Sequence, residues 1–534
     1  MRGMHVRAAL ACAALLAAAA GTPAAAQRAG DAASAVFAGS AMEEYLRVLQ
    51  VAGRAPLHPW SVRGFSPAQV QGLLPADSAG HPWAGRYRFA RDSAPGLRWA
   101  GAEARVVGNS TEPYGNNDGP VWAGRGVTTS LRAGVAYRSR HLWATLAPVA
   151  FVSQNADYGT RPTGYPGLLS YADGRYPRNI DLPQRFGRGA YGRVDPGEST
   201  LGANAGPVTF GASTASQVWG PAVEYPLLLG NNAGGFPHVF VGTSRPLDAW
   251  IGKVHGRVVW GRLDQSPFSS IPADSGVRFM TGAVGTFQPR GVPGLELGVA
   301  RFFHARWQGL GDAPLGLAFE GILKSSLGGS QGQANGSDEA NQLASAFFRW
   351  VAPRDGFEAW GEFAREDHSF DLRDFVLEPD HSAALLLGFR KVWDRGGRLV
   401  SVRGEVADAR TPHLVLVRGE GPFYLHYERR QGHTQRGQLL GSPAVYGGGG
   451  STLAVDVYTA RGSWGAAWKR ELLGESAGPG FIETFGARNT LSLTRSLFTR
   501  GVRVTGGLDT SLDLGNNGDG DRINVNTVLQ VTLP

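Results

Sequence analysis

The chain has 534 residues, of which 77 are glycine, and a formal net charge of +8 at pH 7. The length is enough for about three domains of ordinary size, but no linker, charge block or change in composition divides the sequence. No apolar run after residue 26 reaches the ~18 residues that a membrane-spanning helix requires, which excludes a helical membrane protein. Abundant glycine and aromatic residues are typical of large β structures with many tight turns.

The N-terminal segment has the three parts of a secretory signal peptide. A basic stretch at residues 2–7 precedes an apolar run at residues 8–20, and alanines at 24–26 offer a cleavage site. We therefore expect residues 1–26 to be removed. The only cysteine, Cys12, lies in this segment, so the mature chain would have no thiol for disulfides, catalysis or metal binding.

The basic surplus bears on possible partners. Removing Arg2 and Arg7 with the signal peptide lowers the formal charge by two, from +8 to +6. An exported protein has little occasion to meet nucleic acid, so we expect no nucleic-acid partner. The surplus suits acidic glycans or lipopolysaccharide phosphates, and arginines scattered over the surface explain it equally well.

One amphipathic helix is predicted early in the chain, at residues 41–52. Its apolar residues have the i, i+3, i+4, i+7 spacing of a single helix face. They are Met42, Tyr45, Leu46 and Leu49. Two prolines, Pro56 and Pro59, end the helix.

From about Trp99 onward, apolar and polar residues alternate with a period of two, which predicts β-strands. The clearest alternating segments are residues 452–457, 508–514 and 522–533, and a weaker one is residues 143–151. Turn clusters rich in Gly, Asn and Asp separate such segments at residues 115–119, 394–397 and 515–520.

The alternating pattern alone does not separate a soluble β-sandwich from a membrane barrel. The signal peptide, the lack of cysteine, segments of ~10 residues and aromatic residues near segment ends together favour an all-β fold, a transmembrane antiparallel β-barrel. These aromatic residues are Trp393, Tyr458, Trp464 and Trp468. In such a barrel the apolar set faces lipid, as expected for Leu529 and Val531. The polar set, including Asn526 and Gln530, is expected to face the lumen.

Three apparent functional motifs lack the surroundings that they need. Residues 474–478 fit G-x-S-x-G, but a Pro-Gly pair follows directly where the nucleophile Ser476 would need a helix. Residues 187–192 fit G-x-G-x-x-G without a βαβ unit, and residues 516–521 resemble a calcium loop without its final glutamate. We therefore predict a glycine-rich loop and a hairpin turn, and no catalytic residue, metal site or cofactor.

Two dense stretches stand apart from the alternating pattern. The first has WGP at residues 219–221, LLLGNNA at 227–233 and FPH at 236–238. The second has Y-x-H at residues 424–426, QGHT at 431–434, Gly437 and LGSP at 440–443. These stretches resemble the W-G-P … L-L-x-x-N-N-A … P and Y-x-H … G-[YH]-T-x-x-G … L-G-x-P segments of the Wzi family of capsule-assembly outer-membrane proteins.

The resemblance implies a barrel of about 18 strands with small N-terminal helical elements. Residues 27–98 would form a periplasmic segment and residues 99–534 the barrel. The implied role is a non-catalytic lectin that anchors or assembles capsular or extracellular polysaccharide at the cell surface. It would work as a monomer in the outer membrane, in contact with lipid and lipopolysaccharide.

Sugar binding requires flat aromatic faces, planar amides and guanidinium groups. The candidate binding residues are Trp122, Arg125, Trp219, Asn231, Asn232, His238, His426 and His433. These residues also have structural interpretations. Trp219 could be an interface anchor or fill a turn, the asparagine amides could bond loop backbone, and the histidines could belong to a lumenal hydrogen-bond network. Two other classes of function stay open, a channel with a polar lumen and a hydrolase that uses Ser476.

Overall fold

The computed structural model describes most of the chain after the predicted signal peptide. The described residues are 30–76, 80–89, 95–269, 271, 277–307, 309, 315, 340–366, 376–411, 421–426, 429–473, 486–515 and 520–533. The predicted signal peptide and the G-x-S-x-G motif lie outside them. Of the helices among these residues, none is both long and apolar enough to cross a membrane.

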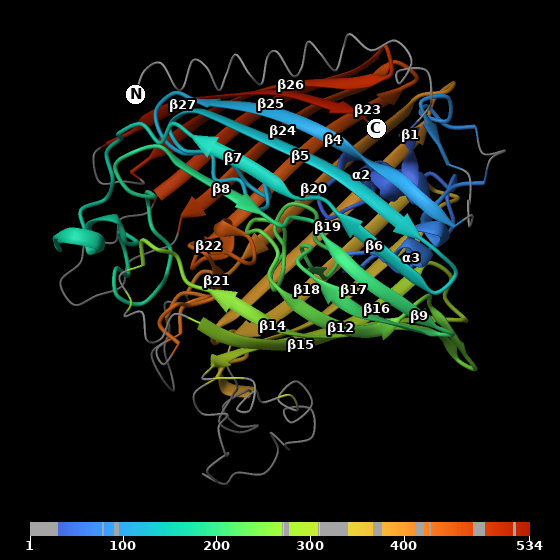
Figure 1. Cartoon of the computed structure of the whole chain (residues 1–534), viewed down its shortest axis with the longest axis horizontal. Coiled ribbons are helices and arrows are strands. Elements are labelled where there is room, and N and C mark those ends of the chain that lie inside the picture. The colour runs from blue at the N-terminus through green and yellow to red at the C-terminus, as the bar shows by residue number, and fades with distance from the viewer. Residues whose placement is uncertain are drawn as a thin grey trace, which may run out of the picture.

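A closed antiparallel barrel of 18 strands forms the wall, as predicted (Figure 1). Its elements are β4 (Gly96–Asn109), β5 (Gly126–Arg138), β6 (Leu142–Leu146), β7 (Val149–Ser153), β8 (Tyr191–Asp195), β9 (Thr200–Ala205), β10 (Val208–Ser213), β12 (His238–Thr243), β13 (Leu247–Ala249), β14 (Gly252–Asp264), β15 (Val277–Pro289), β16 (Leu295–Arg306), β17 (Asn341–Ala352), β18 (Phe357–Glu366), β19 (Ala383–Asp394), β20 (Leu399–Asp408), β23 (Gly449–Thr459), β24 (Gly462–Leu473), β25 (Gly486–Thr499), β26 (Val502–Leu514) and β27 (Arg522–Leu533). The last strand, β27, pairs with β4 and closes the barrel.

Three of the wall strands are interrupted, so the 21 elements make up 18 strands. β12 and β13 both pair with β14, and Pro246 lies between them. β6 and β7 both pair with β5, and Pro148 lies between them. Opposite them, β8 pairs with β7 and β9 pairs with β6, with Pro196 and Gly197 in between. Proline has no N–H to donate to a sheet, so each break falls where the ladder loses a hydrogen bond.

The two ends of the barrel differ. Strands at one end are joined by short turns such as 139–141, 206–207, 460–461 and 500–501, and the last strand ends there. We call this the short-turn end. The opposite long-loop end has the connections 110–125, 154–190 and 214–237.

N-terminal elements fill the lumen at the short-turn end, where Figure 1 shows α2 and α3 inside the barrel. They are β1 (Gly30–Asp31), η1 (Ala32–Ala35), α2 (Ala41–Val51), β2 (Val62–Arg63), α3 (Pro67–Leu73) and β3 (Tyr87–Arg88). The predicted helix is α2, which begins after Ser40, whose hydroxyl accepts the N–H of Glu43 at 3.1 Å. Most of its polar face is buried as well, because the helix lies inside the barrel.

Further elements lie in the long connections. They are η2 (Gly167–Tyr171), β11 (Val218–Trp219), β21 (Thr434–Gln435), β22 (Gln438–Leu439) and η5 (Pro443–Val445). β11 pairs with β2, so the connection 214–237 folds into the lumen and meets the N-terminal elements. We call residues 214–237 and the described parts of 30–89 and 421–448 together the plug.

The alternation in β27 has the predicted orientation. Leu529 is 49% exposed on the lipid face, whereas Asn526 is buried and Gln530 donates to Glu103 of the neighbouring strand β4 at 2.9 Å. The prediction is wrong for residues 143–151, where Trp143 and its apolar partners point inward. A filled lumen offers these side chains a packed interior, which an open lumen would not.

Aromatic residues form part of an interfacial girdle near the short-turn end. Trp393 and Trp464 are exposed close to the ends of β19 and β24, as predicted, and Trp468 is exposed farther along β24. The prediction is wrong for Tyr458, which is 6% exposed and packs inward against Tyr45 of α2. Tyr458, which the sequence pattern assigns to the membrane interface, therefore packs against the plug.

Candidate functional site

The lumen has one dry side, where the plug is fixed to the wall from β14 to β20. Inward-facing apolar side chains such as Val259, Phe302 and Trp360 pack against plug residues Trp219 and Leu228. Packing of this kind excludes water and makes the contact tight.

Wall carboxylates clamp the plug backbone on the same side. Glu405 of β20 accepts the N–H groups of residues 223–225 at 2.7–2.8 Å. Glu296 of β16 accepts those of residues 60–61 at 2.9–3.0 Å. Hydrogen bonds to a buried carboxylate are among the stronger ones in proteins, so these clamps oppose expulsion of the plug.

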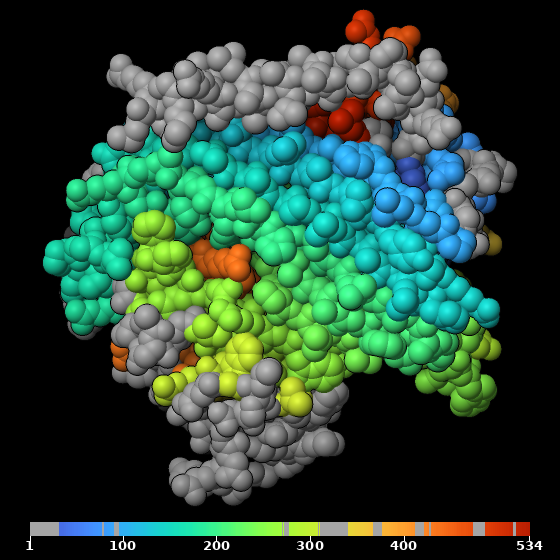
Figure 2. All heavy atoms as spheres, viewed as in Figure 1, coloured from blue at the N-terminus to red at the C-terminus, as the bar shows by residue number. Residues whose placement is uncertain are grey.

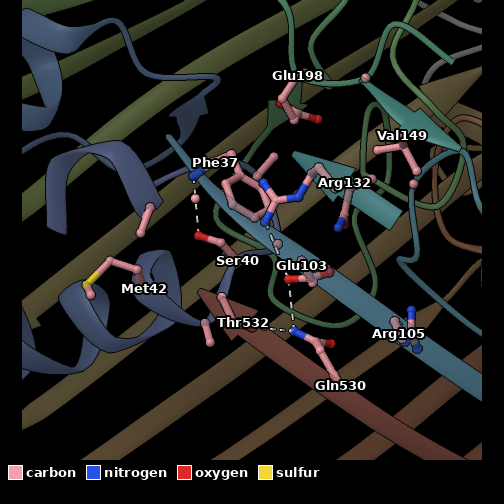
Figure 3. Close-up of a pocket in the computed structure, with 18 of the residues that line it drawn as sticks. Phe37, Ser40, Met42, Glu103, Arg105, Arg132, Val149, Glu198, Gln530 and Thr532 are labelled. Carbon is pink, nitrogen blue, oxygen red and sulfur yellow. Dashed lines mark hydrogen bonds and ion pairs between the residues drawn. The ribbon is translucent and has the colours of Figure 1, made fainter. Parts of the chain in front are cut away.

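The opposite side of the lumen, along β27, β4 and β5, is polar and hollow. A cavity of about 390 Å³ lies there between the wall and residues 31–44 of the plug. Figure 3 shows its centre, where the guanidinium of Arg132 lies over the Phe37 ring at 3.6 Å. Glu103 accepts hydrogen bonds from Arg132 at 3.4 Å and from Gln530 at 2.9 Å.

A second polar cavity, of about 260 Å³, adjoins the first. Its wall residues come from β20 and from β23 to β27 as well as β4, and include Lys469, Asp509 and Asn526. Both cavities are lined by Arg105 and Asp118. These two side chains form an ion pair of 2.5 Å at the boundary.

The long-loop end carries an arginine- and tyrosine-rich connection, residues 154–190, which we call the Arg–Tyr loop. It projects at the left of Figures 1 and 2, in teal. Arg178 is exposed and lies over the Tyr165 ring at 4.6 Å. Arg188 is also exposed, and its Nε donates to the Tyr171 hydroxyl at 3.2 Å.

Internal hydrogen bonds hold the Arg–Tyr loop in one shape. The Asn155 amide donates to three backbone carbonyls, those of residues 186, 187 and 189, at 2.7–3.1 Å. The Asp173 carboxylate accepts two backbone N–H groups of its own turn. Asp181 accepts the N–H of Ser266 at 2.6 Å, and burial raises the Asp181 pKa to about 6. A loop fixed in this way loses little conformational entropy on binding a ligand.

Two of the eight predicted binding residues lie at the base of the Arg–Tyr loop. Trp122 is half-buried against the edge of Phe186, with ring centroids 5.0 Å apart. Arg125 donates to the carbonyl oxygens of Ser110 and Asp157. The structure therefore brings these two side chains to the long-loop end.

Three predicted residues lie in the 214–237 segment of the plug and hold it in place. Asn231 lines the first cavity and donates to the Asn117 carbonyl at 2.7 Å. Asn232 donates to the Leu439 carbonyl at 2.9 Å. Trp219 has no exposed surface, and the adjacent Gly220 leaves room for Glu362, because a Cβ there would lie 2.4 Å from its carboxylate.

The three predicted histidines are buried, and each contacts a backbone group. Nδ1 of His238 is 2.8 Å from the Phe236 carbonyl, and His426 accepts the N–H of Arg429 at 3.0 Å. His433 is stacked on Tyr424 and donates from Nε2 to the Leu228 carbonyl at 2.5 Å. Burial lowers the His433 pKa to about 4, so the ring is neutral at pH 7.

Sequence reasoning missed the Arg–Tyr loop and the two cavities. The loop has a signal, since Arg and Tyr recur through residues 158–193, but the G-x-G-x-x-G string within that stretch predicts only a glycine-rich loop. The cavities have no such signal, because their lining comes from segments far apart in the chain. Within the described ranges, no group of three or more His, Cys, Asp or Glu side chains is placed to hold a metal ion.

Comparisons with known proteins agree with this architecture. Among solved structures, the chain is similar to Wzi of Escherichia coli, with 15% sequence identity and a TM-score of 0.61. That protein is an outer membrane protein involved in group 1 capsule assembly and a carbohydrate-binding β-barrel. The match covers 92% of this chain and 98% of that one. No curated protein matches the chain.

Two other solved barrels are less similar. OccAB2 of Acinetobacter baumannii is 9% identical over 81% of this chain and 97% of its own, with a TM-score of 0.39. OccK7 of Pseudomonas aeruginosa is 11% identical over 83% and 99%, with a TM-score of 0.38. The family model of the capsule assembly protein Wzi matches residues 99–459, more than half of the chain. The chain therefore belongs to the Wzi family of capsule assembly proteins.

Proposed function

We propose that this protein is a non-catalytic lectin that anchors or assembles acidic capsular or extracellular polysaccharide at the cell surface. The family is one of capsule assembly, and the solved relative from E. coli is a carbohydrate-binding outer membrane barrel. The single observation that carries the proposal is the pair of exposed arginines, Arg178 and Arg188, each set against a tyrosine on a rigid loop.

The proposed orientation follows from the two ends of the barrel. A closed antiparallel barrel with apolar strand faces turned to lipid belongs in the outer membrane. Bacterial barrels of this kind have short periplasmic turns and longer extracellular loops. The Arg–Tyr loop would then face the medium and the N-terminal elements the periplasm. We accordingly propose residues 1–26 as signal peptide, 27–98 as a segment at the periplasmic end of the lumen and 99–534 as barrel, with the first wall strand beginning at Gly96.

The chemistry of the loop suits acidic sugars. Guanidinium groups bind carboxylates with two parallel hydrogen bonds, and a tyrosine ring stacks on the apolar face of a pyranose. Trp122 and Arg125 at the base of the loop would extend the surface. We assign Trp219, Asn231, Asn232, His238, His426 and His433 to holding the plug, because their described contacts are internal.

Other partners follow from the same architecture. The lipid face would contact outer-membrane lipid and lipopolysaccharide. Closure leaves no strand edge to pair with a second copy, so we propose a monomer. No residue is assigned a catalytic role.

The proposal is tested by binding of the purified full-length protein to polygalacturonate, a carboxylated polysaccharide, and to neutral dextran. Arg178→Ala combined with Arg188→Ala should weaken polygalacturonate binding by about tenfold, the equivalent of ~1.4 kcal/mol. A matched variant, Arg395→Ala with Arg461→Ala, removes two exposed arginines at the short-turn end and should leave binding unchanged. Equal binding by both double variants would contradict the proposal.

A further inference from the structure

The two cavities form a polar seam along the wall. On β27 the inward-facing residues Thr532 and Gln530 line the first cavity, and Val528 and Asn526 line the second. At ~3.4 Å per residue, Asn526 to Thr532 spans about 20 Å of strand. The first cavity reaches Leu533 at the short-turn end. The second reaches residues 114–116 of the connection that begins at the long-loop end.

One ion pair separates the two halves of the seam. Arg105 projects from β4, and Asp118 comes from the connection 110–125 where it folds into the lumen. The backbone around Asp118 is held in place, because the N–H of Gly119 donates to the Asn231 carbonyl at 2.6 Å and Asn231 returns a hydrogen bond to Asn117. Asn117 has φ of +57°, a region that asparagine tolerates better than most residues.

The lining of the seam is more polar than the apolar packing on the dry side. More than half of the seam's lining residues have charged, amide or hydroxyl side chains, and the charged ones are eight carboxylates and five basic groups. Glu224, for example, is paired with Lys469 and lies 3.6 Å from Arg403. A lining of this kind holds water, and away from the constriction its excess of carboxylates favours cations.

We infer that the seam between the plug and β27–β4 is a path for small inorganic ions, closed in this conformation by the Arg105–Asp118 ion pair. This goes beyond polysaccharide binding, because it needs neither the Arg–Tyr loop nor any sugar. The plug stays clamped on the dry side while ions pass along the wet side. Breaking the pair leaves one fixed charge at the constriction, and that charge sets the ion selectivity.

The test is the conductance of the full-length barrel in planar lipid bilayers under a KCl gradient. Wild type should be nearly silent. Asp118→Ala leaves Arg105 unpaired and should open a Cl⁻-selective conductance, whereas Arg105→Ala leaves Asp118 and should open a K⁺-selective one. The two reversal potentials should therefore have opposite signs. The charge-swapped variant, Arg105→Asp with Asp118→Arg, should return to near silence.

Controls separate the seam from a dislodged plug. Asp248 and Arg290 form an exposed ion pair at the short-turn end, and Asp248→Ala should behave as wild type. Arg105→Gln and Asp118→Asn repeat the test if the alanine variants do not give heat-modifiable barrels. Silence of all variants in intact barrels overturns the inference. So does a conductance of the same weak selectivity in both single variants, which is the result that plug release would give.

Discussion

Arg47 of α2 donates from Nε to Oε1 of Glu358 in β18 at 2.9 Å, and neither side chain has more than 1% of its surface exposed. Glu358 also contacts Arg349 at 2.5 Å and lies 3.9 Å from Arg390. One wall carboxylate thus contacts three arginines, of which Arg47 comes from the plug, and Arg390 is paired with Glu44 of α2 as well. This contact ties α2 to a strand more than 300 residues later in the chain.

Glu358→Gln should destabilise the barrel by about 3–5 kcal/mol, because it leaves buried arginines without their counter-charge. The midpoint of urea unfolding in detergent measures the change. Breaking the half-exposed pair between Arg54 and Asp394 by Asp394→Asn should cost less than about 1 kcal/mol. Similar losses in the two variants would show that the buried cluster does not hold the plug.

Substitutions on β27 test the orientation of the wall. Leu529→Arg places a charge on the lipid face and should cost about 2–4 kcal/mol if the position lies near the bilayer midplane. Gln530→Arg places the same charge in the polar seam and should be much milder. Folding yields into lipid vesicles of the two variants compare them directly. Equal yields would mean that the alternation does not separate a lipid face from a lumenal face.

Acid should loosen the contact between the plug segments 421–448 and 214–237. Burial holds the His433 pKa at about 4 in the folded protein, below its usual 6.5, so the unfolded chain binds more protons between these values. Stability from this site is full above pH 6.5 and is lost as the pH falls toward 4, by at most about 3 kcal/mol. The unfolding midpoint should depend less steeply on pH in His433→Gln than in wild type. An unchanged slope would exclude His433 as the source.

Deleting the gene in a strain that makes a surface polysaccharide should leave the total amount of polymer unchanged. An anchor makes no glycosidic bonds, so only the share bound to cells should fall, with the remainder in the medium. Uronic acid assays of washed cells and of culture supernatant measure both shares. Less total polymer would point to synthesis or export instead of anchoring.

Replacing Trp219 and Asn231 with alanine separates a structural role from a binding role. Trp219 fills the interior beside Phe302 and Asn231 holds the 110–125 connection, so we expect less heat-modifiable barrel. Cell-bound polysaccharide should fall in proportion to the barrel that remains. Normal barrel amounts with lost retention would instead place this segment in the binding surface.

Part of this structure follows from local sequence patterns and could be predicted from them. The period-two pattern of β27 places Leu529 outward and Gln530 inward because successive side chains of a strand point to opposite faces. The i, i+3, i+4 spacing of α2 similarly identifies its apolar face. The family's motif around Trp219 and Asn231 marks a segment that the structure places inside the barrel. A transmembrane barrel with a small helical N-terminus was therefore predictable.

Only the tertiary structure determines which inward-facing side chains contact the plug and which contact water. Tyr458 and Trp143 point inward because the plug fills the lumen. The period-two pattern of their own strands does not reveal this. Arg47 meets Glu358, and β4 meets β27, only after the barrel has closed around the plug. The polar seam and its Arg105–Asp118 pair arise in the same way. Contacts between segments so distant in sequence depend on strand register and closure, and these are properties of the whole chain.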